Sequence, residues 1–275
     1  MNRNDKKSYI KEADKYFESK EYEKTIELLS KIIESEEFDI CNDSFLYFKK
    51  SAAFGSIEDY DKAINDISIY IKHNPNDYDG YCYKGYCYWC KYDYDKAIEN
   101  YTISLNISPN LEAFHSRGWC YCMQKNFHKA LPDFKMALAL SPDNVEACEQ
   151  IGFILLNLHR KDEAIIYLEK SVELGSENSD IFFNIGHYFS KRNDIKAIEA
   201  YEKAIFHGCN YAHAFFMLAC CYYTVSPIQN LGSISLVIKY LEESLKLVKA
   251  DDELEKEIQN LLTRARYERK KFLVY

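Results

Sequence analysis

The chain has 275 residues, of which 47% are hydrophobic and 28% charged, so it has ample material for a folded core and is not expected to be disordered. Its net charge of −8 argues against nucleic acid as a partner, because nucleic-acid binding depends on Lys and Arg side chains that neutralise phosphates, and it also disfavours an anionic membrane surface. The first residues lack the apolar stretch of a signal peptide, and the most apolar patches, 151–156 and 181–185, are too short to span a bilayer, so a cytoplasmic protein is expected.

One period of 33 or 34 residues runs through most of the chain. Three residue types recur with this period, each in its own column. The glycines are Gly85, Gly118, Gly152 and Gly186, the alanines are Ala63, Ala97, Ala130, Ala164 and Ala197, and the prolines are Pro75, Pro109 and Pro142. Because three independent columns share one period, the sequence predicts a tandem repeat.

The residues around these columns indicate the type of repeat. The third unit reads Tyr81-x2-Lys84-Gly85-x2-Tyr88, then Ala97-x3-Tyr101 and a closing Pro109. The fourth unit has, at the same places, Phe114, Arg117, Gly118, Tyr121, Ala130, Phe134 and Pro142. This pattern resembles the tetratricopeptide repeat, in which a large residue, Leu-Gly and Tyr precede Ala-x3-Phe and a closing Pro. Lys84 and Arg117 depart from the usual Leu, and their methylene groups are expected to lie along the core while their charges stay in water.

The resemblance implies an all-α fold, a right-handed α-solenoid of antiparallel helix pairs that forms one domain over residues 1–275. Seven repeats are expected near 6–39, 44–77, 78–110, 111–144, 145–178, 179–211 and 212–250, followed by a capping helix at 251–273. First helices of the central repeats are expected near 44–57, 78–91, 111–124, 145–158 and 179–191. The terminal repeats match the pattern less well, as is expected where a solenoid must end in a more polar face.

Several residues predict where second helices begin and where the pattern is interrupted. Asp59, Asp93 and Asn126 are expected to cap the N-termini of second helices. Pro132 falls inside the second helix of the fourth repeat and removes a backbone donor, so this helix is expected to start late or to be kinked. Six extra residues separate the two helices of the last repeat, and the stretch 224–236 is expected to form a surface loop.

No residue pattern in the chain predicts catalysis. The glycines follow the repeat instead of clustering in a phosphate-binding loop, and no nucleophile elbow or zinc-protease helix occurs. The sequence therefore predicts a protein that is not an enzyme and needs no cofactor. The ten cysteines are expected to be reduced, metal-free thiols that fill small spaces in the core. The alternative is a zinc site, drawn from Cys82, Cys87, Cys90, Cys120 and Cys122.

The resemblance places function in a concave groove formed by the first helices, which in this family takes a peptide or a partner helix. By register, one column of groove residues consists of Tyr86, Trp119, Phe153 and His187. A second, acidic column consists of Asp79, Glu112, Glu146 and Asp180. Further groove positions are Tyr83, Trp89, His115, Glu149 and Phe183. An aromatic row beside an acidic row suits a segment with basic and apolar residues. The alternative is that the aromatic rings pack between repeats while the acids stabilise the first turns of their helices.

These observations predict a non-catalytic scaffold or adaptor that binds a protein or peptide. The alternative is an architectural subunit of a larger assembly that binds through its ends or convex face, which a large exposed apolar patch off the groove would favour. Members of the family that clamp an acidic chaperone C-terminal tail use Lys, Asn and Arg side chains on three consecutive first helices. The equivalent positions here are Ile10, Asp14, Lys49, Asp79 and Tyr83. Only Lys49 is basic, so this type of partner is not expected.

Overall fold

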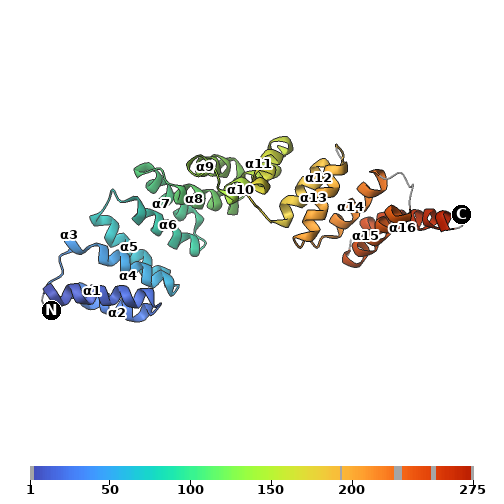
Figure 1. Ribbon diagram of the computed structural model, residues 1–275. Coiled ribbons are helices and arrows are strands. Elements are labelled where there is room, and N and C mark those ends of the chain that lie inside the picture. The colour runs from blue at the N-terminus through green and yellow to red at the C-terminus, as the bar shows by residue number, and fades with distance from the viewer. Residues whose placement is uncertain (1–2, 193, 226–230, 249–251, 274–275) are drawn as a thin grey trace. The chain divides into compact units, whose positions relative to one another are not determined.

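The computed structural model describes residues 3–192, 194–225, 231–248 and 252–273, and this part of the chain contains sixteen α-helices and no β-strand (Figure 1). In chain order the helices are α1 Arg3–Glu18, α2 Tyr22–Ile33, α3 Ile40–Asp43, α4 Phe45–Ser56, α5 Tyr60–His73, α6 Tyr78–Cys90, α7 Tyr94–Ile107, α8 Leu111–Met123, α9 Phe127–Leu140, α10 Val145–Asn157, α11 Lys161–Glu173, α12 Ser179–Phe189, α13 Asp194–Phe206, α14 Ala212–Val225, α15 Leu231–Leu247 and α16 Asp252–Leu273. The predicted all-α class is confirmed, and the first helices α4, α6, α8, α10 and α12 agree with the predicted bounds to within two residues.

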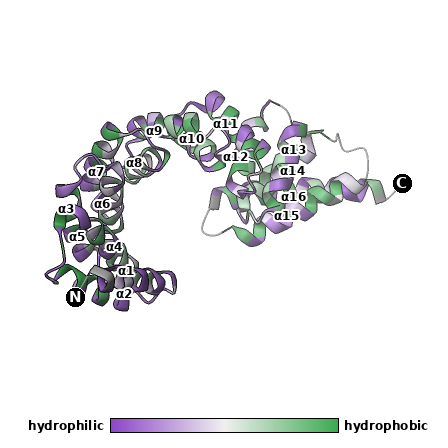
Figure 2. Cartoon of the chain, turned by 60° about the vertical axis from the view of Figure 1, so that its left-hand side comes forward, coloured by the Kyte–Doolittle hydropathy of each residue, from purple (hydrophilic) through white to green (hydrophobic). Residues whose placement is uncertain are grey.

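Contacts within the chain divide it into two compact units, Met1–Ala147 and Cys148–Tyr275, and each is described on its own. The boundary falls near the start of α10. In both units single helices carry hydrophilic and hydrophobic residues along their length (Figure 2), as is expected of helices that bury one face and expose the other. The prediction that the chain forms one domain stays a prediction.

The first unit is built from helix pairs, in which a first helix packs against the second helix of its own repeat. The pairs are α1 with α2, α4 with α5, α6 with α7, and α8 with α9. Successive pairs stack through contacts of α2 with α4, α5 with α6, and α7 with α8. The short helix α3 was not predicted; the side chain of Asp39 caps its start, and Lys6 forms an ion pair with Asp43 at its end.

A close approach of the two helices in a pair explains the repeated glycine. A Cβ atom added at Gly85 would lie 2.9 Å from the ring of Tyr101, and one at Gly118 would lie 2.8 Å from the ring of Phe134. The same approach occurs twice in the second unit, between Gly152 and Leu168 and between Gly186 and Tyr201. A larger residue at these places would force the helices apart.

The turn between the helices of a pair contains a left-handed residue that the sequence did not predict. The residues with φ near +60° are Lys20, Glu58, Tyr92, Lys125 and His159. Each directly precedes the N-cap residue of a second helix. As predicted, the carboxylates of Asp59 and Asp93 accept hydrogen bonds from backbone N–H groups of the following helices. Asn126 occupies the N-cap position of α9, as predicted, although its side chain makes no such bond.

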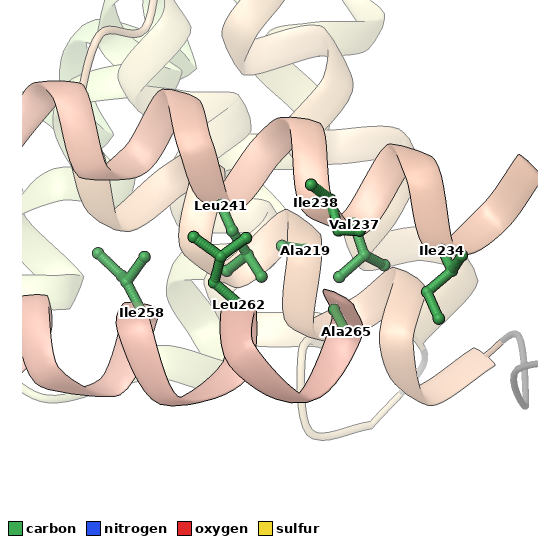
Figure 3. Packing of buried hydrophobic residues seen from close by; sticks show 8 residues of the cluster. All are labelled: Ala219, Ile234, Val237, Ile238, Leu241, Ile258, Leu262 and Ala265. Atoms are coloured by element: carbon green, nitrogen blue, oxygen red, sulfur yellow. The ribbon is translucent and has the colours of Figure 1, made fainter. Parts of the chain in front are cut away.

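The second unit ends in a core shared by α14, α15 and α16 (Figure 3). Its buried residues are Ala219, Ile234, Val237, Ile238, Leu241, Ile258, Leu262 and Ala265. The three residues on α16 are spaced four and three apart, which places them on one face of the helix. Beside this face, Arg266 of α16 forms an ion pair with Glu242 of α15 at 2.8 Å. The helix α16 therefore covers the last repeat, as predicted for a capping helix.

One local prediction was wrong, and another was wrong in part. The helix α14 continues to Val225 and α15 begins at Leu231, so both ends of the predicted loop 224–236 are helical, while residues 226–230 lie outside the described part of the chain. The extra residues of the last repeat thus contribute to helices, and α15 reaches 17 residues. The helix α9 begins at Phe127 and runs past Pro132 to Leu140, so it does not start late, and the kink expected as the other outcome stays a prediction.

Candidate binding pockets

The predicted groove residues lie on the first helices α6, α8, α10 and α12. On each of these helices the acidic residue of one column precedes the large residue of the other column by seven positions. Seven residues make about two helical turns, so the two side chains leave the same face of the helix about 10 Å apart along its axis. The acids therefore lie near the N-termini of the first helices, and the large side chains lie in the second half.

In the first unit, three predicted groove residues surround one pocket of about 440 Å³, called the aromatic pocket below. Tyr86 and Trp89 come from α6, and Trp119 comes from α8. The other lining residues are Tyr101 of α7 and Ser116 and Met123 of α8. Tyr86 and Trp89 keep 43% and 37% of their surface exposed. The pocket can therefore take an apolar side chain, or a cationic one held against a ring face.

Trp119 has a packing role as well as a place in this pocket. It is half-buried, and its ring meets that of Phe134 edge-on with centroids 6.1 Å apart. His115, one turn earlier on α8, contacts the same Phe134 ring at 5.5 Å. Its Nε2 atom lies 3.3 Å from a carboxylate oxygen of Glu146. Both rings of α8 thus hold the repeat together, and the ring of Trp119 also lines the pocket.

Tyr83 does not line the aromatic pocket. Its hydroxyl donates a hydrogen bond to the backbone carbonyl of Ser51 at 3.2 Å, and its ring lies 5.5 Å from that of Phe48. The hydroxyl also fills the space beside Gly55, where an added Cβ would lie 2.2 Å from it. Burial raises the pKa of Tyr83 above its ordinary value. Tyr83 therefore packs the second repeat against the third.

Several acids of the predicted groove have partners within their own unit. In the second unit, Asp180 accepts a hydrogen bond from the hydroxyl of Tyr211 at 2.8 Å, and Glu149 accepts one from Ser176 at 2.5 Å. In the first unit, burial and then the neighbouring carboxylate of Asp77 raise the pKa of Asp79, while Glu112 is exposed. Asp180 of the acidic column and Glu149 therefore have structural contacts in addition to any role toward a ligand.

The second unit contains a pocket of about 290 Å³ between α11 and α12, called the cationic pocket below. Its apolar lining consists of Leu156, Ile165 and Leu168. Its basic lining consists of Lys161, Lys191 and Arg192. Asn184, His187 and Tyr188 of α12 complete the lining. Of these residues, sequence analysis had placed only His187 in the groove.

The remaining groove residues of this unit lie beside the cationic pocket and not in its lining. Phe153 is half-buried and packs against the core residues around Ile165 and Ile181. Phe183 stacks on His187 with ring centroids 6.4 Å apart and also contacts the ring of His213. Burial, followed by the charges of Lys161, His213 and Lys191, lowers the pKa of His187. Lys161 and Lys191 therefore place positive charge near this histidine.

The two pockets occupy the same place in the repeat, one at the junction of the third and fourth repeats and one at the junction of the fifth and sixth. Counted from the packing glycine of each first helix, five lining positions of the two pockets are equivalent. The equivalent pairs are Trp89 and Leu156, Tyr101 and Leu168, Ser116 and Asn184, Trp119 and His187, and Met123 and Lys191. This comparison of repeats is the sequence signal from which Ser116, Met123, Asn184 and Lys191 could have been found.

The cysteines of the alternative zinc site lie in or near the core of the first unit. Cys82, Cys87 and Cys120 are buried, and all ten cysteines are free thiols. Burial raises the pKa of Cys87 and of Cys120 to about 12, which disfavours the thiolate that binds metal. Within the described residues, no three His, Cys, Asp or Glu side chains are placed to hold a metal ion. The prediction of a metal-free protein is still to be tested by elemental analysis.

Comparison with known proteins identifies the repeat. Family models of the tetratricopeptide repeat match residues 112–144 and 145–177, which are the fourth and fifth repeats. The chain is a tetratricopeptide repeat protein. In the part of this tetratricopeptide repeat protein that the structure describes, no helix is long and apolar enough to cross a membrane.

Solved tetratricopeptide repeat structures share the fold at low sequence identity. YrrB, described as a tetratricopeptide repeat protein with an unusual peptide-binding site, has a TM-score of 0.59 at 17% identity and covers 70% of this chain and 97% of its own. PilF of Pseudomonas aeruginosa has a TM-score of 0.60 at 16% identity, and the match covers 81% of this chain and 99% of the PilF chain. MamA has a TM-score of 0.56 at 17% identity, and the match covers 62% of this chain and 91% of the MamA chain.

One curated relative matches in sequence over a shorter stretch. The heat shock protein STI1 of Saccharomyces cerevisiae is 31% identical over 105 residues. This stretch is 38% of the present chain and only 17% of the length of STI1. The similarity therefore extends to a small part of STI1.

Proposed function

We propose that this tetratricopeptide repeat protein is a non-catalytic adaptor that binds a segment of another protein along its first helices. The observation that carries the proposal is the aromatic pocket between α6, α7 and α8. Tyr86 and Trp89 border it and remain 43% and 37% exposed. Large apolar groups gathered in water at one place suggest that another molecule covers them. The proposed compartment is the cytoplasm, where free cysteines stay reduced.

The chemistry of the pocket defines the side chain that it would take. Aromatic ring faces accept aliphatic groups and attract the charged ends of Lys and Arg. The exposed carboxylate of Glu112 lies about two turns from Trp119 on α8 and adds attraction for a basic residue. The proposed ligand of the first unit is therefore an extended segment with apolar and basic residues, and neither nucleic acid nor a membrane. The peptide-binding description of YrrB supports a peptide as the kind of ligand.

An acidic chaperone tail is not the ligand proposed for the first three repeats, although STI1 is a heat shock protein. Lys49 is the one basic residue at the positions that would clamp such a tail. Its ammonium group forms an ion pair with Asp14, so it is already neutralised. Asp14 and Asp79 would repel a carboxylate brought to these helices.

Substitutions in the aromatic pocket test the proposal on the partner that the protein retains in pull-down from its source cell. Trp89→Ala and Trp119→Ala are each expected to weaken binding by about 2 kcal/mol, roughly thirtyfold, because a central aromatic anchor contributes much of the energy of an interface. Calorimetry with the purified partner measures the dissociation constants. Trp89→Ala is the more decisive of the two substitutions, because Trp89 is exposed and its removal disturbs the core less than removal of Trp119.

The matched control is Tyr92→Ala, which removes an aromatic ring that is 78% exposed but lies outside the pocket. This variant is expected to bind like the wild type. If Trp89→Ala and Tyr92→Ala both bind as tightly as the wild type while remaining folded by circular dichroism, the interface lies elsewhere and the proposal is wrong.

A second candidate function, an architectural subunit, has support from three exposed side chains on second helices of the second unit. Phe206 is 84% exposed, and Ile166 and Ile195 are 63% and 62% exposed. These residues lie on α11 and α13 and away from the first helices. If this surface joins an assembly, Phe206→Ser abolishes co-purification of the partner whereas Trp89→Ala leaves it intact.

A further inference from the structure

The cationic pocket of the second unit differs in composition from the aromatic pocket, its equivalent in the first unit. Leu156, Ile165 and Leu168 give it an apolar side, and two lysines, one on α11 and one in the turn after α12, give it a basic side. Lys161 begins α11, and Lys191 follows the end of α12, so the fold brings them to one pocket from places thirty residues apart. A chain with a net charge of −8 concentrates positive charge here.

The third basic residue of the pocket is already engaged. Arg192 lies over the ring of Tyr188 at 4.2 Å and within 3.6 Å of the carboxylate of Asp162. The same carboxylate accepts a hydrogen bond from the hydroxyl of Tyr188 at 2.9 Å. Among the described residues, in contrast, neither Lys161 nor Lys191 has a carboxylate partner. Arg192 and Asp162 cancel, so about two positive charges stay uncompensated at the pocket.

The charges at the pocket affect the pKa of His187. Its pKa is lowered, first by burial and then by Lys161, His213 and Lys191, which approach it from α11, α14 and the end of α12. Two lysines and a second histidine that face one imidazole repel a proton placed there. The same arrangement attracts an anion, because it lowers the energy of a negative charge at the pocket.

We propose that the cationic pocket binds an acidic segment of a partner protein, with a carboxylate between Lys161 and Lys191 and an adjacent apolar side chain against Leu156, Ile165 and Leu168. The proposal rests on the proposed function, that the protein binds polypeptide segments, and gives the second unit a ligand of opposite charge to that of the first. An acidic residue beside an apolar one matches both sides of the pocket. A solvated ion alone would leave the apolar side uncovered.

The aromatic pocket occupies the equivalent place in the repeat but lacks the positive charges of the cationic pocket. There Trp119 stands in place of His187 and Met123 in place of Lys191, so the same site is neutral. The chain therefore uses one pocket position twice and changes its preference through the side chains. This comparison also explains why a single ligand chemistry is not expected along the whole groove.

The test uses the full-length protein and a fluorescently labelled probe peptide, Gly-Ser-Asp-Leu-Glu-Leu-Ser-Gly, acetylated and amidated at its ends so that only side-chain carboxylates are charged. Fluorescence anisotropy is expected to give a dissociation constant below about 1 mM at low salt, weakening several-fold as salt screens the charges. The variant with both Lys161→Glu and Lys191→Glu is expected to bind at least tenfold more weakly. Both lysines are exposed, so this variant is expected to fold.

Matched controls separate the pocket from the charge of the whole chain. Lys256→Glu places a charge reversal on the exposed face of α16 and is expected to leave binding unchanged. A peptide with Lys in place of its acids is expected to bind only the aromatic pocket, so that Trp89→Ala weakens its binding. A peptide with Ser in place of its leucines is expected to bind the cationic pocket at least threefold more weakly. Bound peptide is expected to raise the pKa of His187, followed by the NMR signals of its ring protons, because a nearby carboxylate stabilises the imidazolium.

Three results would overturn the proposal. The acidic peptide does not bind; the double lysine variant binds as well as the wild type; or only a peptide with phosphoserine in place of Asp and Glu binds, which would replace the carboxylate by a phosphate. None of these results contradicts the proposed function, because that function is tested by substitutions of Trp89 and Trp119 in the other unit.

Discussion

At the scale of single residues, the position that this repeat usually fills with Leu shows what the sequence could not predict. Arg117 was expected to keep its charge in water. Instead, its guanidinium donates two hydrogen bonds, of 2.8 and 2.7 Å, to the carboxylate of Asp133, which is 4% exposed, and a third of 3.0 Å to Thr102. The carboxylate raises the pKa of Arg117. The sequence shows both charges, but only the packing of α8 on α9 makes them partners.

Removing one member of this ion pair is expected to lower the free energy of unfolding more than removing both. Asp133→Ala leaves the half-buried guanidinium of Arg117 without its carboxylate and is expected to lower the free energy of unfolding by about 3 kcal/mol, measured by urea denaturation. Arg117→Leu combined with Asp133→Ala restores the Leu typical of the repeat and is expected to lie within about 1 kcal/mol of the wild type. A double variant as unstable as Asp133→Ala would mean that lost packing, and not unpaired charge, causes the destabilisation.

At the scale of helices, the pattern predicted the bounds well because Gly, Ala and Pro each have a physical role at a fixed place. The glycines admit the ring or Leu side chain of the second helix, as at Gly118 and Phe134. The turns were harder, because a positive φ is normally signalled by Gly or Asn. Here the residue before the N-cap is Lys, Glu, Tyr, Lys or His, and none of these indicates a left-handed conformation.

One of these turns offers a way to stabilise the protein. Tyr92 has a φ of 59° and is 78% exposed, so its side chain contributes little packing while its backbone is strained. Tyr92→Gly is expected to raise the free energy of unfolding by about 0.5–1 kcal/mol. Glycine removes the cost of the left-handed backbone conformation, and this gain is partly offset because glycine gives the unfolded chain more conformational entropy. Tyr92→Ala keeps the Cβ atom and is expected to bring no gain. Equal effects of the two substitutions, measured by thermal denaturation, would show that the side chain and not the backbone is responsible.

At the scale of the whole molecule, the register of the repeat predicted which helix faces carry the large side chains. Tyr86, Trp89 and Trp119 do surround one pocket. The charge of the pockets could not be predicted from the first helices alone, because each pocket also takes residues from a second helix or from the following turn. Lys161 and Lys191 are such residues, and they make the pocket of the second unit basic where an acidic groove had been expected.

A stack of repeats has no central core, so a loss of packing is expected to remain near the repeat where it occurs. Leu262 is 4% exposed in the core that α16 shares with α14 and α15. Leu262→Ala is expected to cost about 2–4 kcal/mol of local stability, because it leaves a cavity in the core that α16 shares with α14 and α15. Hydrogen–deuterium exchange followed by mass spectrometry is expected to show faster exchange in α14–α16 and unchanged exchange in α6–α9.

Gln259→Ala, on the exposed face of the same helix, is the matched control and is expected to leave exchange unchanged everywhere. The expectation rests on the division of the chain into two compact units, each with its own buried clusters. If Leu262→Ala accelerates exchange in α6 and α8 as much as in α15, the chain unfolds as one cooperative unit. Its repeats would then depend on one another over a longer range than contacts between neighbouring repeats provide.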